Sequence, residues 1–189
     1  SIYAGKIYDM AVNPLDASKW YAIADRKLIR SYDDGATWTP GTYTFGTPQA
    51  VIRMAVTAAD TSRLYFARAN ALILRSLNGG QTITQVANVS GNGHQSDYDK
   101  PIAASPIDVN TLYVGLVPLM KSVNGGTAWT NISSFVNTDV DYIHPDFHGL
   151  KVAPYNPDKL FAVNDGGIWV SYDAGASYQS LNNGINISQ

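Results

Sequence analysis

Two residue types are missing from this sequence of 189 residues: it has no cysteine, and all fifteen of its acidic residues are aspartate. The absence of cysteine excludes disulfide bonds and thiolate metal sites. The absence of glutamate leaves aspartate as the only side-chain carboxylate for catalysis or cation binding. No run of eighteen apolar residues occurs, so the sequence predicts no transmembrane helix. A net charge of −2 gives no basic excess for binding nucleic acid or an acidic membrane surface.

The composition is that of a globular protein rich in β-structure. Hydrophobic residues make up 45% of the chain and charged residues 15%, which is enough apolar material to bury one core. The 12 tyrosines, 5 phenylalanines and 4 tryptophans favour strands. The chain begins with serine, from which we expect either a removed leader or a start within a longer polypeptide.

A short pattern occurs four times: Ser, any residue, Asp or Asn, any residue, Gly, two residues and then usually an aromatic residue. Its serines are 45, 46 and 49 residues apart, a period in the range of a four-stranded propeller blade. The residues that define the pattern are Ser31, Asp33, Gly35 and Trp38; Ser76, Asn78 and Gly80; Ser122, Asn124, Gly126 and Trp129; and Ser171, Asp173, Gly175 and Tyr178.

The pattern has the chemistry of a hairpin turn. An Asp or Asn side chain accepts hydrogen bonds from backbone N–H groups of its own turn, and Gly adopts positive φ without steric cost. Alternating apolar residues on both sides predict strands, and the aromatic residue can fold back over the hairpin. We therefore assign the four turns a structural role. Arg30, Arg75 and Lys121 each precede the serine, and this repetition predicts a repeated surface.

A second element repeats in phase with the turns. It consists of a strand of small residues, a turn usually opened by Pro, and a strand with an aromatic residue, so each repeat predicts four strands. The four copies are 11–14 with 19–21, 55–58 with 63–65, 103–106 with 111–113, and 151–154 with 159–161. The repeats divide the chain at about 1–45, 46–92, 93–137 and 138–189.

These phased repeats resemble the Asp-box, or BNR, repeat of sialidases, family 74 xyloglucanases, sortilin-type receptors and secreted bacterial proteins. The resemblance implies an all-β propeller of four-stranded antiparallel blades, four of them in this chain, in a secreted or cell-surface protein. Such propellers usually have more blades. We therefore expect part of a larger propeller, with the remaining blades or another subunit covering its edges. The fold carries many functions, so it does not by itself imply an activity.

Two polar loops, 88–100 and 137–148, contain all three histidines. If the strands of each blade run outward from the axis, both loops emerge on the face opposite the Ser-led turns. Loops on a rigid frame are common binding sites. We therefore expect ligand contacts from His94, Asp97, Tyr98, Asp99, Asp141, His144, Asp146 and His148.

The chemistry of these loops has three open interpretations. His144, Asp146 and His148 alternate, so in an extended strand they would share one side and offer ligands to a divalent cation. Two carboxylates could act as acid and base in glycoside cleavage. Alternatively, the side chains only hydrogen-bond loop backbones. The carboxylate candidates for catalysis are Asp97, Asp99, Asp139, Asp141 and Asp146.

The sequence favours a non-catalytic binding or scaffold module for a glycan or protein ligand, with no cofactor required. A polysaccharide hydrolase of xyloglucanase type is the alternative. The Gly-rich signature of family 74 xyloglucanases and the Arg-Ile-Pro motif of sialidases are both absent, which disfavours these two enzymes.

Overall fold

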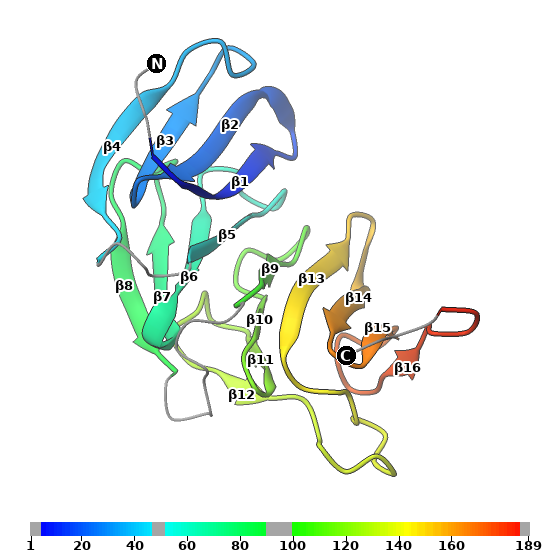
Figure 1. The fold of residues 1–189 in the computed structure, drawn as a ribbon. Coiled ribbons are helices and arrows are strands. Elements are labelled where there is room, and N and C mark those ends of the chain that lie inside the picture. Colours follow the sequence, from blue (N-terminus) through cyan, green and yellow to red (C-terminus); the bar gives the residue numbers. More distant parts are fainter. Residues whose placement is uncertain (1–4, 47–51, 90–99, 186–189) are drawn as a thin grey trace.

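The computed structural model describes residues 5–46, 52–89 and 100–185, and it is all-β. Sixteen strands form four antiparallel sheets of four strands, in which strands adjacent in sequence are adjacent in space (Figure 1). The described residues include no helix long and apolar enough to cross a membrane. The first sheet contains β1 (Ile7–Asn13), β2 (Asp16–Ala24), β3 (Lys27–Ser31) and β4 (Thr39–Thr44); the second β5 (Ile52–Val56), β6 (Leu64–Arg68), β7 (Leu72–Ser76) and β8 (Thr84–Asn88), with a 3-10 turn at Ala69–Ala71; the third β9 (Ile102–Ala104), β10 (Leu112–Gly115), β11 (Leu119–Ser122) and β12 (Thr130–Asn131); the fourth β13 (Phe147–Ala153), β14 (Asn156–Asn164), β15 (Gly167–Ser171) and β16 (Gln179–Ser180).

The four sheets follow one another around a common centre as propeller blades. The first strands of successive sheets contact one another, β1 with β5, β5 with β9, and β9 with β13, so these strands are innermost. Figure 1 shows the resulting arc, with the first and fourth sheets at its two ends. The propeller predicted from the repeats is therefore confirmed.

The core consists of three apolar layers, one between each pair of neighbouring sheets. Successive side chains of a strand point to opposite faces of the sheet, so each sheet contributes to both neighbouring layers. Leu28 of β3, for example, packs against the second sheet, while Ile29 lies on the opposite face of the first sheet. Full burial of a Leu or Phe side chain stabilises the fold by about 1.5–3 kcal/mol. Contact between sheets, more than any single sheet, therefore holds the arc together.

Each Ser-led turn joins the third strand of a sheet to the fourth, as the sequence predicts. In the first of them, Ser31 Oγ donates to Asp33 Oδ1 (2.7 Å) and accepts from the Gly35 N–H (2.9 Å). The same pair of bonds occurs at Ser76, Ser122 and Ser171, all nearly inaccessible to solvent. Trp38 and Trp129 fold back over their turns and donate from Nε1 to the carbonyls of Gly35 and Gly126.

Candidate functional site

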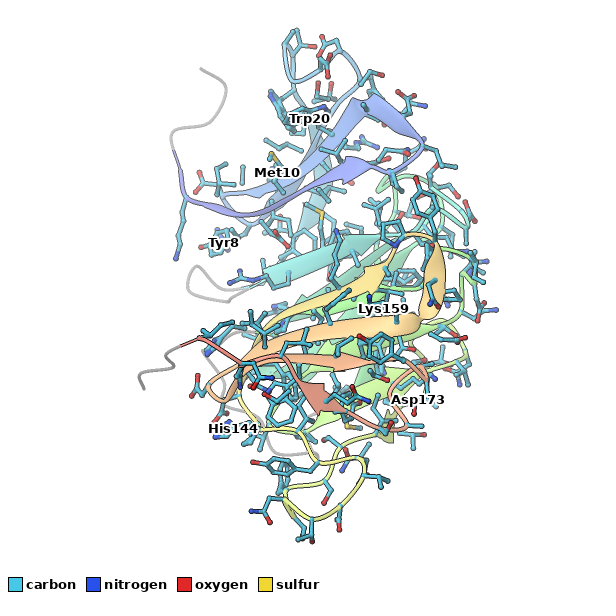
Figure 2. The ribbon with its side chains drawn as sticks, turned by 90° about the vertical axis from the view of Figure 1, so that its right-hand side faces the viewer. Tyr8, Met10, Trp20, His144, Lys159 and Asp173 are labelled. Atoms are coloured by element: carbon cyan, nitrogen blue, oxygen red, sulfur yellow. The ribbon has the colours of Figure 1, made fainter. Side chains whose placement is uncertain are left out.

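The two ends of the strands form two different faces of the arc. The Ser-led turns lie on one face, together with the turns that join first to second strands. In the fourth sheet, for example, the Ala174 N–H of the Ser-led turn donates to the Asp158 carbonyl near the start of β14. The other face, called here the link face, carries the turns between second and third strands and the beginnings of the inner strands. Figure 2 shows His144 and Tyr8 at one end of the strands and Asp173 at the other. The segment 144–148 and the turns between second and third strands therefore lie on the face opposite the Ser-led turns, as predicted, whereas residues 90–99 of the other predicted loop lie outside the described residues.

On the link face, His148 and Asp165 form a hydrogen-bonded pair. His148 is the second residue of β13, and its Nε2 contacts Oδ1 of Asp165 in the turn between β14 and β15. The β13–β14 register shifts between Phe147 and Gly149, so His148 lies in a bulge, a feature that redirects a side chain. Both side chains are about one-third exposed, at 30% and 38%. The pair therefore presents a fixed imidazole and a fixed carboxylate to solvent.

His144 is held in place by the turn that carries Asp165. Its backbone carbonyl accepts a 2.5 Å hydrogen bond from Nδ2 of the buried Asn164, and its Nδ1 lies 3.0 Å from the Pro145 carbonyl oxygen. A Cβ at Gly166 would lie 2.4 Å from His144 Cβ, so this approach requires glycine. Asn182 then bonds the Gly166 carbonyl (2.8 Å) and the Ile168 N–H (2.9 Å). The segment 144–148 and the turn 164–167 thus form one rigid unit.

The common side expected for His144, Asp146 and His148 is not observed. Asp146 has φ +63°, in the left-handed region, and β13 begins only at Phe147, so these residues do not lie in one extended strand. Asp tolerates this conformation better than most residues. Within the described ranges, no three His or Asp side chains are grouped to hold a metal ion. The strand geometry that suggested a cation site at these three residues is therefore wrong.

Asp139 and Asp141 lie in a loop that follows the outer edge of the fourth sheet. Ser134 donates from Oγ to the Asp139 carboxylate (2.5 Å) and from its N–H to the Asp141 carbonyl (2.9 Å). A third hydrogen bond holds the loop: the backbone N–H of Tyr178, the residue before the outermost strand β16, donates to the Val140 carbonyl. The Asp139 carboxylate thus stabilises its own loop, which is the third of the interpretations given above. It lies at the outer edge of the sheet, whereas Asp146 directly precedes the inner strand β13.

Four of the predicted site residues, His94, Asp97, Tyr98 and Asp99, fall in 90–99, outside the described residues. Their contribution to the site stays a prediction.

Basic side chains of the link face belong to the other end of the arc. Arg26 Nη1 donates to the Gly46 carbonyl (2.5 Å), and Arg53 Nη1 donates to the Tyr8 carbonyl (3.1 Å). Asp9 accepts from the Met54 N–H (2.7 Å) beside Arg53, and burial raises the pKa of its carboxyl. The described part of the link face thus carries arginines together with the Asp9 carboxylate on the first two sheets, and the His–Asp unit on the fourth.

Asp165 was not among the predicted site residues. Its turn, Asn164-Asp165-Gly166-Gly167, is recognisable in the sequence, and a turn between second and third strands must lie on the link face. Sequence spacing does not reveal its contact with His148, because that contact depends on the bulge in β13.

Comparison with solved structures agrees with the fold. A GH74 enzyme of Niastella koreensis superposes with a TM-score of 0.72 at 21% identity, over 94% of this chain and 24% of that one. The GH74 xyloglucanase of Xanthomonas campestris gives 0.68 at 21% identity, over 94% and 30%. YCF48 from Cyanidioschyzon merolae gives 0.65 at 13% identity, over 94% and 56%.

These similarities are structural. No protein-family model and no curated protein sequence matches the chain. The chain spans about a quarter to a third of the two GH74 proteins, and all three identities are too low to show more than a shared propeller fold.

Proposed function

We propose that this chain is an Asp-box propeller portion that acts as a binding or scaffold module, with a protein segment as its ligand on the link face. The observation that carries the proposal is the His148–Asp165 pair, held in a β-bulge and one-third exposed. A preorganised imidazole and carboxylate can hydrogen-bond backbone amides and polar side chains of a partner without first being ordered themselves.

The spread of charged and polar side chains over the link face supports a protein ligand. Arg26 and Arg53 lie on the first two sheets, whereas Asp165 and the histidines lie on the fourth. A peptide segment carrying both charge signs is complementary to this arrangement, and such complementarity contributes to specificity and association rate. A structure of YCF48 bound to D1 peptide is similar to this chain (TM-score 0.59, 11% identity), which supports a peptide as the ligand.

The positions of the tryptophans argue against a glycan site on the link face. Glycan sites use aromatic faces beside paired carboxylates, but Trp38 and Trp129 fold over turns on the opposite face. Trp169 packs edge-on against Tyr142, in the layer between the third and fourth sheets. The alternative, glycan binding or hydrolysis with Asp146 as a carboxylate, is supported by the likeness to GH74 enzymes.

A secreted or cell-surface setting is part of the proposal and is supported by the resemblance to secreted Asp-box proteins. It predicts that the native gene product is recovered from the culture medium or the cell surface of its source.

The test is selection of a random 12-residue peptide display library on the purified chain. Binding of the enriched peptides should weaken about tenfold or more in His148→Ala and Asp165→Ala, because each removes one or two hydrogen bonds from the site. Tyr155→Ala is the control, since Tyr155 is 98% exposed in the β13–β14 turn on the opposite face.

Equal binding by the His148 variant would overturn the protein-ligand proposal. Titration calorimetry with xyloglucan oligosaccharides addresses the alternative: heat that disappears in Asp146→Asn, or release of reducing sugar, would favour the glycan function.

A further inference from the structure

Neighbouring sheets are joined by a repeated polar contact. The basic residue before each Ser-led turn reaches across to a backbone carbonyl in the corresponding turn of the next sheet. Arg30 Nη1 donates to Gly79 (3.3 Å), Arg75 Nη1 to Gly125 (3.0 Å) and Lys121 Nζ to Ala174 (2.9 Å). These side chains are therefore connectors between sheets, and the repeated surface expected from the sequence is wrong for them.

A tyrosine accompanies each connector. Tyr21, Tyr65 and Tyr113 stand directly opposite Arg30, Arg75 and Lys121 in the register of the second and third strands. Tyr65 Oη donates to the Val109 carbonyl (2.5 Å), and Tyr113 Oη to the Ala174 carbonyl (3.3 Å), both in the next sheet. Burial raises the pKa of Tyr113 to about 12, which keeps its hydroxyl a donor.

The fourth sheet has a different pair at these positions. Phe161 stands opposite Val170 in the register of β14 and β15. Neither side chain can donate a hydrogen bond, so these two positions of the fourth sheet lack the basic connector that the other three sheets extend and the tyrosine connector of the second and third sheets.

The first sheet, at the other end of the arc, has a solvent-exposed face that corresponds to the faces on which the other three sheets receive the preceding sheet. Met10 and Val12 of β1 stand opposite Ala22 and Trp20 of β2, and they are 53% and 39% exposed. Trp20 occupies the register position of Leu64, Leu112 and Leu160, each fully buried against the preceding sheet. The face is therefore built like three covered faces of the same chain.

The turn of the first sheet is also shaped for a neighbour. A Cβ on Gly80 would lie 2.2 Å from Leu28 Cδ2 of the preceding sheet, and one on Gly175 would lie 2.5 Å from Ile132 Cδ1. Gly35 has the same positive φ, +83°, yet a Cβ there would meet only its own Trp38 at 3.8 Å. In the other three turns, the residue three places after the serine, Gly79, Gly125 or Ala174, accepts the connector with its backbone carbonyl. In the first turn this position is Asp34.

We propose that this face of the first sheet, formed by Met10, Val12, Trp20 and the turn at Gly35 above the buried Ala22 and Ile29, docks a further blade of the same propeller that carries a Tyr and Arg or Lys connector pair. The fourth sheet of a second copy does not offer this pair, because Phe161 and Val170 stand at its positions and the Lys159 ammonium of that face lies over the Phe161 and Tyr172 rings, 5.0 and 5.2 Å from their centroids. The first three sheets of a second copy do not fit either, because their connector faces are covered within their own chain.

The test places a duplicate of the third repeat, 93–137, directly before Ser1 of the full chain. Its Tyr113 and Lys121 then face the first sheet. A matched fusion carries Tyr113→Phe and Lys121→Val in the duplicate only, which reproduces the pair of the fourth sheet. The chain has no cysteine, so Val12→Cys reports cover of the face by its rate of thiol labelling, and Val123→Cys, 67% exposed on a turn tip, is the control site.

The native duplicate should slow labelling at position 12, and the matched fusion should label about tenfold faster than the native one, the effect of two hydrogen bonds. Labelling at position 123 should be equal in both. A duplicate of the second repeat, 46–92, carries Tyr65 and Arg75 and repeats the test with different core residues should the first fusion fail to fold.

Equal labelling of Val12→Cys in the native and matched fusions would overturn the proposal. Sedimentation of the unfused chain provides the second arm: a dimer in which position 12 is protected would show that a second copy covers the face instead.

Discussion

Two adjacent glycines in the second Ser-led turn should respond very differently to the same substitution. Gly79 and Gly80 both have positive φ, +64° and +80°. A Cβ on Gly79 would have no atom within 4 Å, whereas a Cβ on Gly80 would lie 2.2 Å from Leu28 Cδ2 and 3.2 Å from Leu64 Cδ1. Gly79→Ala therefore tests backbone strain alone, and Gly80→Ala tests strain together with overpacking.

The expected magnitudes follow from these contacts. An L-residue in the left-handed region costs about 1–2 kcal/mol, which is the whole cost of Gly79→Ala. The chain itself has Ala174 at the equivalent position of the fourth turn, with φ +57°. Gly80→Ala adds the overpacking of a completely buried Leu28, about 1–3 kcal/mol. A difference of about 2 kcal/mol corresponds to about 4–8 °C in Tm for a domain of this size.

Urea and thermal unfolding of the two variants, followed by circular dichroism, measure the difference. Gly35→Ala is the third arm, and in the chain alone it should behave like Gly79→Ala because a Cβ there meets only Trp38. Equal losses of stability in Gly79→Ala and Gly80→Ala would refute the idea that the invariant turn glycine is required by the adjoining sheet.

Three further outcomes are expected. Ser122→Ala should lower the free energy of unfolding by about 1–3 kcal/mol in urea titration, because the buried Gly126 N–H loses its acceptor, while Thr42→Ala at an exposed position should have little effect. Hydrogen bonds from Ser177 and Ser171 lower the pKa of Asp173 to about 2, below its ordinary 3.8, so the stability that its carboxylate contributes is present above about pH 4 and lost as pH falls toward 2. Asn occupies the equivalent positions 78 and 124 and does not titrate. The substitution Asp173→Asn should therefore make Tm less dependent on pH between 5 and 2. Gly166→Ala should displace His144, seen as shifts of the backbone amide resonances of 144–148 with those of the first sheet unchanged.

The local chemistry of the repeats was predictable because it acts over a few residues. A Ser, an Asp or Asn and a Gly at fixed spacing satisfy one another's hydrogen bonds wherever the turn is placed, as Ser31, Asp33 and Gly35 do. Four such turns at a steady period dictate four similar sheets, and the strand order then places turns and links on opposite faces.

The site was only partly predictable because its contacts are between distant strands. His148 and Asp165 are seventeen residues apart, and they meet because a bulge shifts the β13–β14 register. The left-handed backbone at Asp146 breaks the alternation on which the cation interpretation depended. The hydrogen bond from Tyr178 to Val140 moves Asp139 and Asp141 to the outer edge, and no local pattern encodes that bond.

The sequence by itself determined the repeat and the turns, since each is set by interactions within one hairpin. Only the tertiary structure decided which side chains converge and how sheets recognise each other. The tyrosine and the basic residue opposite it look like ordinary strand residues until the next sheet places a carbonyl within their reach, as Lys121 and Ala174 show. Convergence of this kind depends on packing across the arc, which spacing along the chain does not specify.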